Sequence, residues 1–400
     1  MPLVLRPPLR WFYLSCLAAF TGGHVVNYTL ILYAQEAIGS DLLSGIGFGL
    51  AFGPPVVLGW VAGVWCDRLA PGRLIHAAQA VFVLAAALLW AADATTAAAA
   101  PRVAALVAGA ALTGVGWSFV SPARMATLGQ IASADEIKPA SVIFNLLVMV
   151  GFGLGPLVLA LARSRLGWPG VFAAAIALFA LAWLALLPVR TRPSARVHEP
   201  VAVEIRQGVA AVRADALLAQ LMVAAMVGYL AMGPLTVLLP KLAATRLALS
   251  EVQRGSFLGA LALALIAGGL VALALAPRAH HGRTILAGTA LAGVWLAALG
   301  LVHSASWALL LLAGVGVAGG LALSLIVAGI QARSPAALRG RVVSMYTVIS
   351  QVVPAASGVV AGALVQGFGV GAALVACGAT LALAMLVNAR WMGALRAHQG

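Results

Sequence analysis

The feature that most constrains this chain is a series of long apolar runs, nearly free of charged residues, that recurs from one end of the sequence to the other. A helix of about 20 apolar residues crosses the hydrocarbon layer of a membrane. We place twelve such spans, at residues 11–34, 43–65, 74–94, 103–124, 142–162, 170–189, 216–239, 255–276, 284–303, 306–330, 342–365 and 370–391. The sequence therefore predicts an all-α membrane protein with twelve transmembrane helices.

Composition argues against most enzyme classes. Hydrophobic residues make up 63% of the chain and charged residues 8%, whereas soluble domains average about 45–50% and 25%. Ten acidic residues leave little material for a carboxylate metal cage, and three widely spaced cysteines indicate neither a disulfide framework nor a zinc site. The GxSxG and HExxH motifs of hydrolases and proteases are missing from the sequence. We therefore expect no catalytic residues, no metal site and no cofactor, and we do not expect an enzyme.

The basic residues orient the spans. The 24 Lys and Arg residues give a net charge of +14, but they fall in the short gaps between apolar runs rather than in one patch. We therefore expect no nucleic-acid partner. If the N-terminus is cytoplasmic, 18 of the 24 lie on the cytoplasmic side, as the positive-inside rule requires. The other six are Arg102, Arg163, Arg165, Lys241, Arg246 and Arg254. This bias predicts that both termini are cytoplasmic.

A polar stretch from Arg190 to Asp215 divides the spans into six and six. The predicted organisation is a six-helix bundle at residues 1–189, a cytoplasmic linker with an amphipathic helix at 190–215, and a second six-helix bundle at 216–400. Turn-like sequences at 166–170 and 367–371 repeat this layout at a period of about 200 residues. Paired bundles with substrate bound between them are typical of secondary transporters, whereas a channel would favour repeated pore-lining filters.

The loop between the second and third spans combines glycines, an aspartate and arginines, namely Gly63, Asp67, Arg68, Gly72 and Arg73. A carboxylate at a cytoplasmic helix end can pair with the positive N-terminus of a neighbouring helix. The helix that begins near Arg341 is on the same side, so Asp67 would act as a conformational latch. A solvated turn whose arginines set the topology is the alternative. The loop resembles the signature of the major facilitator superfamily, in which that neighbour is the eleventh helix.

The fifth span carries the segment Gly151-Phe-Gly-Leu-Gly155-Pro156. A GxxxG face lets two helix backbones approach closely, and a proline lets a helix bend. The segment resembles the glycine-proline motif of that superfamily's antiporters, although Ala160 replaces a later glycine of the pattern. We expect Gly151, Gly155 and Pro156 to serve either plain helix packing or an export-specific conformational change.

Residues Gln331–Tyr346, followed by Pro354 and Gly358–Gly362, closely resemble the enterobactin-exporter-like branch of the same superfamily. The resemblance implies a proton-driven exporter of siderophores, drugs or other small organic molecules in a bacterial inner membrane. An importer or a lipid-flipping transporter of the same fold is the alternative. The expected partners are a small-molecule substrate, protons and membrane lipids, and we expect a monomer. Arg339 and Arg341 either gate the mouth of a helix or anchor the topology.

Polar residues inside the spans are few and therefore informative. His24, Asn27 and Tyr28 have the i, i+3, i+4 spacing of one helix face. The other candidates for a cavity lining are Trp117, Ser118, Tyr229, Ser350 and Gln351. Each of them has helix packing or interhelical hydrogen bonding as its alternative. Together they predict a mostly apolar, aromatic cavity that suits amphipathic or aromatic cargo better than sugars.

His24 is the only ionisable residue predicted near the bilayer midplane. Burial disfavours its charged form, and alternating exposure to the two sides would let it take up and release protons. The alternative is a neutral histidine bonded to a hydroxyl or a carbonyl. Many relatives in the superfamily carry an acidic residue at this place. Glu36, at the outer end of the first span, is the second proton-coupling candidate, with a solvated rim position as its alternative.

Overall fold

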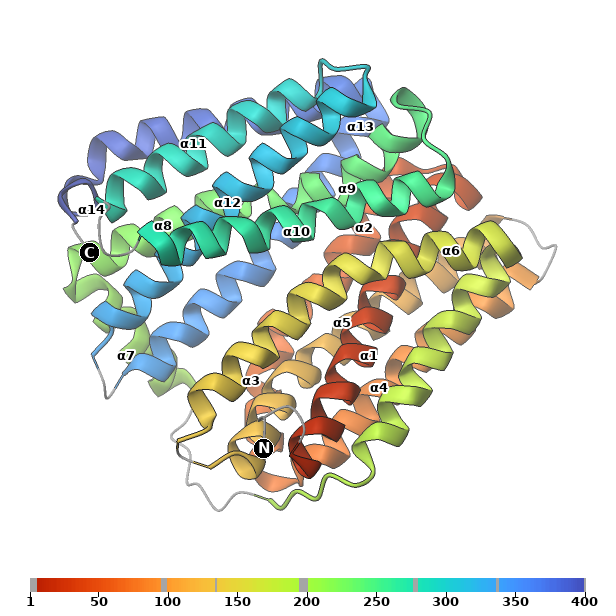
Figure 1. Cartoon of the computed structure of the whole chain (residues 1–400), viewed down its shortest axis with the longest axis horizontal. Helices are drawn as coiled ribbons and strands as arrows, with labels where there is room; N and C mark the ends of the chain where they lie inside the picture. Colours follow the sequence, from red (N-terminus) through yellow and green to blue (C-terminus); the bar gives the residue numbers. More distant parts are fainter. Residues whose placement is uncertain are drawn as a thin grey trace. The chain divides into compact units, whose positions relative to one another are not determined.

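The computed structural model describes residues 6–94, 99–133, 135–193, 201–275, 280–335 and 338–398, except for the side chains of residues 60–64, 66, 67, 138, 201, 202 and 204. Within these residues every regular element is a helix, as predicted (Figure 1). The chain forms two compact units, Met1–His198 with Ser250–Gly259, and Glu199–Leu249 with Ala260–Gly400. They are called the first and the second unit below.

The helices up to residue 186 are α1 (Pro7–Leu32), continued by η2 (Tyr33–Ile38), α2 (Asp41–Phe52), α3 (Pro55–Arg68), α4 (Pro71–Ala94), α5 (Ala99–Ile131) and α6 (Ile137–Leu186). Those that follow are α7 (Val201–Ala214), α8 (Ala216–Tyr229), α9 (Met232–Lys241), η3 (Leu242–Arg246), α10 (Glu251–Leu275), α11 (His281–Leu299), α12 (Ala305–Arg333), α13 (Arg339–Trp391) and α14 (Gly393–Ala397). The chain of α10 begins in the first unit and continues in the second. The domain limits drawn from the sequence, at residues 189 and 215, stay a prediction.

Ten helices among the described residues are long and apolar enough to cross a membrane. Two of them, α6 and α13, each contain one non-helical glycine, Gly167 with φ 65° and Gly369 with φ 78°. Glycine adopts a positive φ at little cost because it has no Cβ. Both glycines lie in the turn sequences predicted between two spans, so α6 and α13 hold two spans each. The prediction of a twelve-span all-α fold is confirmed.

The two parts of α6 run antiparallel on α1. The hydroxyl of Tyr13 donates to the carbonyl of Ala140 at 3.3 Å, and the hydroxyl of Ser15 donates to the carbonyl of Ala182 at 2.7 Å. Tyr13 and Ser15 are two residues apart on α1, whereas Ala140 and Ala182 are 42 residues apart on α6. The chain of α6 must therefore reverse its direction between Ala140 and Ala182. Figure 1 shows this reversal where the yellow part of α6 passes into green.

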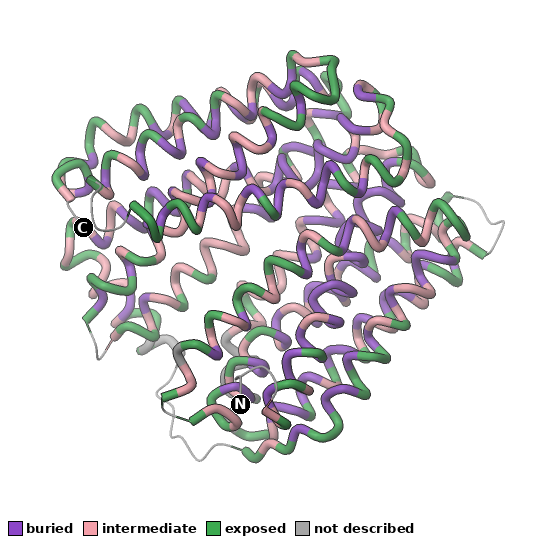
Figure 2. The backbone as a smooth tube through the Cα atoms, viewed as in Figure 1, coloured by how far each residue is buried: buried purple, intermediate pink, exposed green. Residues whose placement is uncertain are grey.

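One helix is central in each unit. In the first unit α1 is buried along nearly its whole length, whereas its neighbours bury one face (Figure 2). In the second unit α9 is similar, because every residue from Gly233 to Pro240 is buried. Exposed Leu, Val and Trp side chains cover the outer faces of both units, which suits helices surrounded by lipid tails.

The C-terminal segment packs on the ends of two helices of the second unit. Leu395 of α14 is buried, and its N–H donates to Oε1 of Gln220 on α8 at 2.8 Å. The N–H of Gly282, at the start of α11, donates to the carbonyl of His398 at 3.2 Å. The rings of His281 and His398 lie 5.8 Å apart.

We expect this C-terminal segment to loosen below about pH 6.5. Burial first, and then the neighbouring His281 and Arg333, lower the pKa of His398 below its ordinary value near 6.5. The docked segment therefore binds a proton less readily than the free one, so the stabilisation is present above pH 6.5 and is lost as the pH falls through the lowered pKa. Hydrogen exchange at the Leu395 amide, corrected for intrinsic rates, should show less protection at about pH 5.5 than at about pH 7.5. His398→Asn should remove most of that difference, and equal protection of the unchanged protein at both pH values would contradict the prediction.

Candidate functional site

Three helices of the first unit bring four of the predicted cavity residues together. Trp117 of α5 donates its indole N–H to Oδ1 of Asn27 on α1 at 3.1 Å. The ring of His24 lies 5.5 Å from that of Trp117 and 5.1 Å from that of Phe152 on α6. Tyr28, one turn further along α1, has its ring 6.2 Å from Phe152. We call His24, Asn27, Tyr28, Trp117, Phe152 and the neighbouring Phe20 the aromatic cluster.

Glycines make room for this cluster. A Cβ on Gly23 would lie 2.6 Å from the Trp117 ring, and a Cβ on Gly155 would lie 2.6 Å from the Cβ of His24. A Cβ on Gly151 would similarly lie 2.6 Å from the Cβ of Phe20. The predicted GxxxG segment therefore lies where the backbones of α6 and α1 approach closely. Pro156 is buried beside it.

The cluster has one unsatisfied donor and one titratable ring. Asn27 is 3% exposed, and its side-chain N–H₂ group has no hydrogen-bond partner. Buried polar groups are nearly always paired, so such a group is free to bind an acceptor on a ligand. Among the described residues nothing hydrogen-bonds to the ring of His24, which contacts aromatic rings instead. The hydroxyl or carbonyl partner considered in the alternative for His24 is thus not found in the described part of the chain.

Phe152 was missed from the sequence because phenylalanine is the commonest kind of packing residue in an apolar span. Its position between Gly151 and Gly153 was the available signal, since a ring flanked by glycines lies at a helix contact. Ser118, by contrast, donates its hydroxyl to the carbonyl of Gly114 in its own helix at 2.8 Å. The structure therefore places Ser118 in a helix-internal bond and not in the aromatic cluster.

In the second unit a tyrosine pair joins α8 and α13. The hydroxyls of Tyr229 and Tyr346 lie 2.6 Å apart, and their rings lie 5.9 Å apart. Ser350, one turn beyond Tyr346, donates its hydroxyl to the carbonyl of Thr347 at 2.7 Å. The side-chain carbonyl of Gln351 is buried and has no partner. Tyr229 was predicted to line a cavity, whereas Tyr346 was indicated only as the last residue of the segment Gln331–Tyr346.

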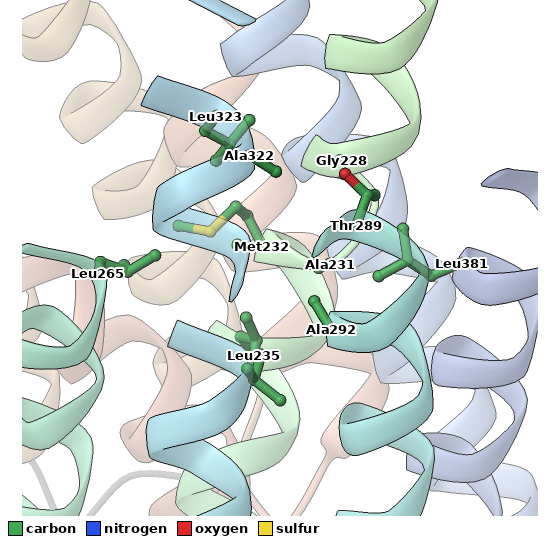
Figure 3. Close-up of a pocket in the computed structure, with 12 residues that line it drawn as sticks. Gly228, Ala231, Met232, Leu235, Leu265, Thr289, Ala292, Ala322, Leu323 and Leu381 are labelled. Carbon is green, nitrogen blue, oxygen red and sulfur yellow. The ribbon is translucent and has the colours of Figure 1, made fainter. Parts of the chain in front are cut away.

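The second unit also contains a pocket that the sequence did not indicate (Figure 3). It is small and lies next to the interruption between α8 and α9. Its lining residues are Gly228, Ala231, Met232, Leu235, Leu265, Thr289, Ala292, Val315, Gly319, Ala322, Leu323 and Leu381. All are apolar except Thr289, whose buried hydroxyl has no partner. The pocket therefore has an apolar lining and one hydroxyl that is free to form a hydrogen bond.

Glu36 lies in a cluster of ion pairs at one end of the first unit. Its carboxylate pairs with Arg163 of α6 and, at 3.3 Å, with Arg254 of α10. Arg163 also pairs with Glu251 at 3.4 Å and lies over the ring of Trp168, 4.3 Å from its centre. The Glu36 carboxylate therefore has two guanidinium partners, one from α6 and one from α10. Its role in proton coupling stays a prediction.

The motif residues near the loop after α3 are only partly described. Gly63 and Asp67 lie in α3, but their side chains fall outside the described part of the structure. Arg68 and Arg73 are exposed, and the N–H of Gly72 donates to the hydroxyl of Thr191 at 2.9 Å. The loop is therefore tied to the chain that follows α6.

The remaining basic candidates begin α13. Arg339 is exposed and Arg341 is half-buried. A Cβ on Gly208 of α7 would lie 3.5 Å from the carbonyl of Arg341, so the helix of the linker packs against this end of α13. In the described part of the chain, no three His, Cys, Asp or Glu side chains gather as a metal site would require.

Comparison with known proteins places this arrangement among transporters. The sequence profile of the family described as Major Facilitator Superfamily matches residues 12–358. A POT peptide transporter in complex with sulfate has a TM-score of 0.77 at 15% identity, over 98% of this chain and 96% of that one. A D-xylose–proton symporter has a TM-score of 0.76 at 14% identity, over 96% of each chain. A bacterial homolog of the human lysosomal transporter Spinster reaches 0.69 at 16% identity, over 98% and 96%. No curated protein matches the sequence.

Proposed function

The chain belongs to the major facilitator superfamily, and from that premise we propose that it exports small amphipathic organic molecules, such as siderophores or drugs, in exchange for protons. As a member of this family it is a multi-pass membrane transporter and not an enzyme. In the proposal it resides in a bacterial inner membrane and works by alternating access, with the two bundles at residues 1–189 and 216–400 as the moving parts. It acts as a monomer surrounded by lipid.

The aromatic cluster is the observation that carries this proposal. The rings of Trp117 and Phe152 contact His24, and Asn27 offers one donor, so the site combines large apolar contact area with a single directed hydrogen bond. Such a site binds aromatic or amphipathic molecules, whereas a sugar would need many paired polar groups. The apolar pocket of the second unit has the same character. His24 would exchange the coupling proton as its exposure to the two sides alternates.

The outward direction rests on two segments. The Leu338–Val342 core resembles the exporter branch, and the contacts of Gly151 and Gly155 with α1 are those expected of a glycine-proline motif that shapes the cavity. The alternative is import, or the flipping of lipids between leaflets. One of the similar structures is a proton symporter, which is the reason for retaining import as an alternative. Its 14% identity to this chain supports only the fold.

Inside-out membrane vesicles test direction and cargo together. With the lumen acidified, a panel of aromatic dyes, drugs and siderophores should accumulate inside vesicles that contain the protein. Collapsing the pH gradient with an ionophore should release them, and vesicles without the protein are the control. Accumulation only in right-side-out vesicles would instead establish an importer. Movement of a labelled phospholipid without movement of any dye would establish a lipid flippase.

Topology is a separate expected outcome of this proposal. Reporter fusions at the C-terminus and within residues 190–215 should both report the cytoplasm, because 18 of 24 basic residues then lie on that side. A fusion in the loop after α6 residue Leu166, between the fifth and sixth spans, should report the opposite side and serves as the control. A periplasmic C-terminus would end this topology.

Asp67→Asn is expected to impair transport while leaving expression largely intact. Its charge should stabilise the state closed to the cytoplasm through the positive end of a helix of the other bundle. Spin-label distances between α3 and α13 should then show a larger inward-open population. Asp135→Asn changes an exposed carboxylate of the same unit and is the matched control. Unchanged populations in the Asp67 variant would mean that the loop only anchors the topology.

A further inference from the structure

Arg124 of α5 is a fully buried cation in the first unit. The sequence placed it at the cytoplasmic end of a span, but α5 continues to Ile131, so the side chain lies inside the bundle with 0% exposure. One terminal N–H group donates to the sulfur of Cys16 at 3.0 Å, and the other to the carbonyl and hydroxyl of Ser15 at 3.2 and 3.3 Å. Its Nε–H has no partner. Among the described residues, no carboxylate forms an ion pair with it.

A second buried side chain of the first unit also lacks partners. Gln79 of α4 is 0% exposed, and neither its side-chain carbonyl nor its N–H₂ group is hydrogen-bonded. His76, one turn away on the same helix, has its ring 4.4 Å from that of Trp183. Trp183 follows Ala182, whose carbonyl accepts the hydroxyl of Ser15. Gln79 and the Arg124 guanidinium, which binds Ser15, therefore lie at a similar height along the helices of the first unit.

The unpaired donors of Arg124 and Gln79 favour the binding of an anion. A buried charge that meets only neutral acceptors keeps much of its desolvation cost, and ionisable groups in membrane spans are usually functional. The planar guanidinium fork matches a carboxylate with two parallel hydrogen bonds. A carboxylate there would also accept from the free Nε–H of Arg124 or from the side-chain N–H₂ of Gln79.

The guanidinium adjoins the aromatic cluster. It lies over the ring of Phe20, 5.6 Å from the ring centre, and Phe20 in turn stacks on Trp117 with the planes 6° apart. A ligand that extends from these rings to Arg124 would need an apolar ring at one end and a negative charge at the other.

We infer that Arg124, with Gln79, binds the carboxylate of an aromatic carboxylic acid whose ring packs at the Phe20 end of the aromatic cluster. The inference rests on the proposed function and adds the charge of the cargo to it. Arg124 is then a specificity-determining residue that selects anionic over neutral aromatic molecules.

Calorimetric titration of the full chain in detergent tests this with benzoate, and with benzyl alcohol as a neutral molecule of similar shape. The unchanged protein should bind benzoate and show at least tenfold weaker binding of benzyl alcohol. Arg124→Gln should weaken benzoate binding about 10- to 100-fold, the effect of losing hydrogen bonds to a charged group. Gln79→Leu should weaken it less and keeps the test valid if the arginine variant does not fold. Arg165→Gln, an exposed arginine of the same unit, should bind benzoate normally.

Two results would overturn the inference. One is benzoate binding that is unchanged in both Arg124→Gln and Gln79→Leu, or absent from the unchanged protein. The other is chloride competing as well as benzoate, which would mean a simple structural anion. Because the titration needs no gradient, its outcome is independent of the vesicle assay. If the vesicles show no export but the protein still selects benzoate, the proposed function is wrong and the carboxylate site is supported.

Discussion

His24→Gln is expected to abolish pH-gradient-driven accumulation of cargo while cargo binding stays measurable. Glutamine keeps hydrogen-bonding capacity and similar length but does not titrate in the physiological range. The imidazole is held by the rings of Trp117 and Phe152 and not by a hydrogen bond from the described residues. In the proposed mechanism the imidazole gains a proton when water reaches one side and loses it on the other. Vesicle accumulation with and without an imposed gradient measures the effect.

The control for this variant is His303→Gln, because His303 is an exposed histidine between α11 and α12. It should transport as the unchanged protein does. If the His24 variant still concentrates cargo in response to the pH gradient, proton coupling lies elsewhere. Glu36 and Asp41 are then the next residues to test, although Glu36 already pairs with two arginines.

Gly155→Ala is expected to destabilise the first unit by about 1–3 kcal/mol, the usual cost of overpacking. The new Cβ would lie 2.6 Å from the Cβ of His24 and 3.1 Å from its backbone carbonyl carbon. Neither atom is at the end of a flexible side chain, so α1 and α6 must move apart. Thermal unfolding in detergent should shift down by several degrees, and cargo binding should weaken because His24 moves with α1.

Gly129→Ala provides the matched comparison, since Gly129 is a helical glycine of α5 with no atom within 4 Å of the added Cβ. Alanine is a better helix former than glycine, so this variant should unfold at the same or a slightly higher temperature. The result for Gly155 also separates two interpretations of the motif. Normal stability with impaired export would favour an export-specific bend, whereas lost stability favours plain close packing.

Local signals in the sequence predict the fold and part of the candidate site. The i, i+3, i+4 spacing of His24, Asn27 and Tyr28 predicts one helix face, and the structure gives that face a partner in Trp117. Partners that carry no polar signal, such as Phe152, cannot be told from ordinary packing residues. The burial of Arg124 was not predicted, because a hydropathy pattern treats an arginine at the end of a span as solvated, whereas α5 runs on to Ile131 and covers it.

The sequence by itself determines the number of spans and the turns within α6 and α13. Each span must satisfy its backbone hydrogen bonds within its own helix in a bilayer, so one continuous run of residues suffices to specify it. Only the tertiary structure decides that Arg163 meets Glu36, that Arg124 meets Ser15 and Cys16, and that Thr289 lines a pocket. These contacts join residues far apart in the chain, and they depend on how side chains from different helices fill space, for which no single stretch of sequence carries the information.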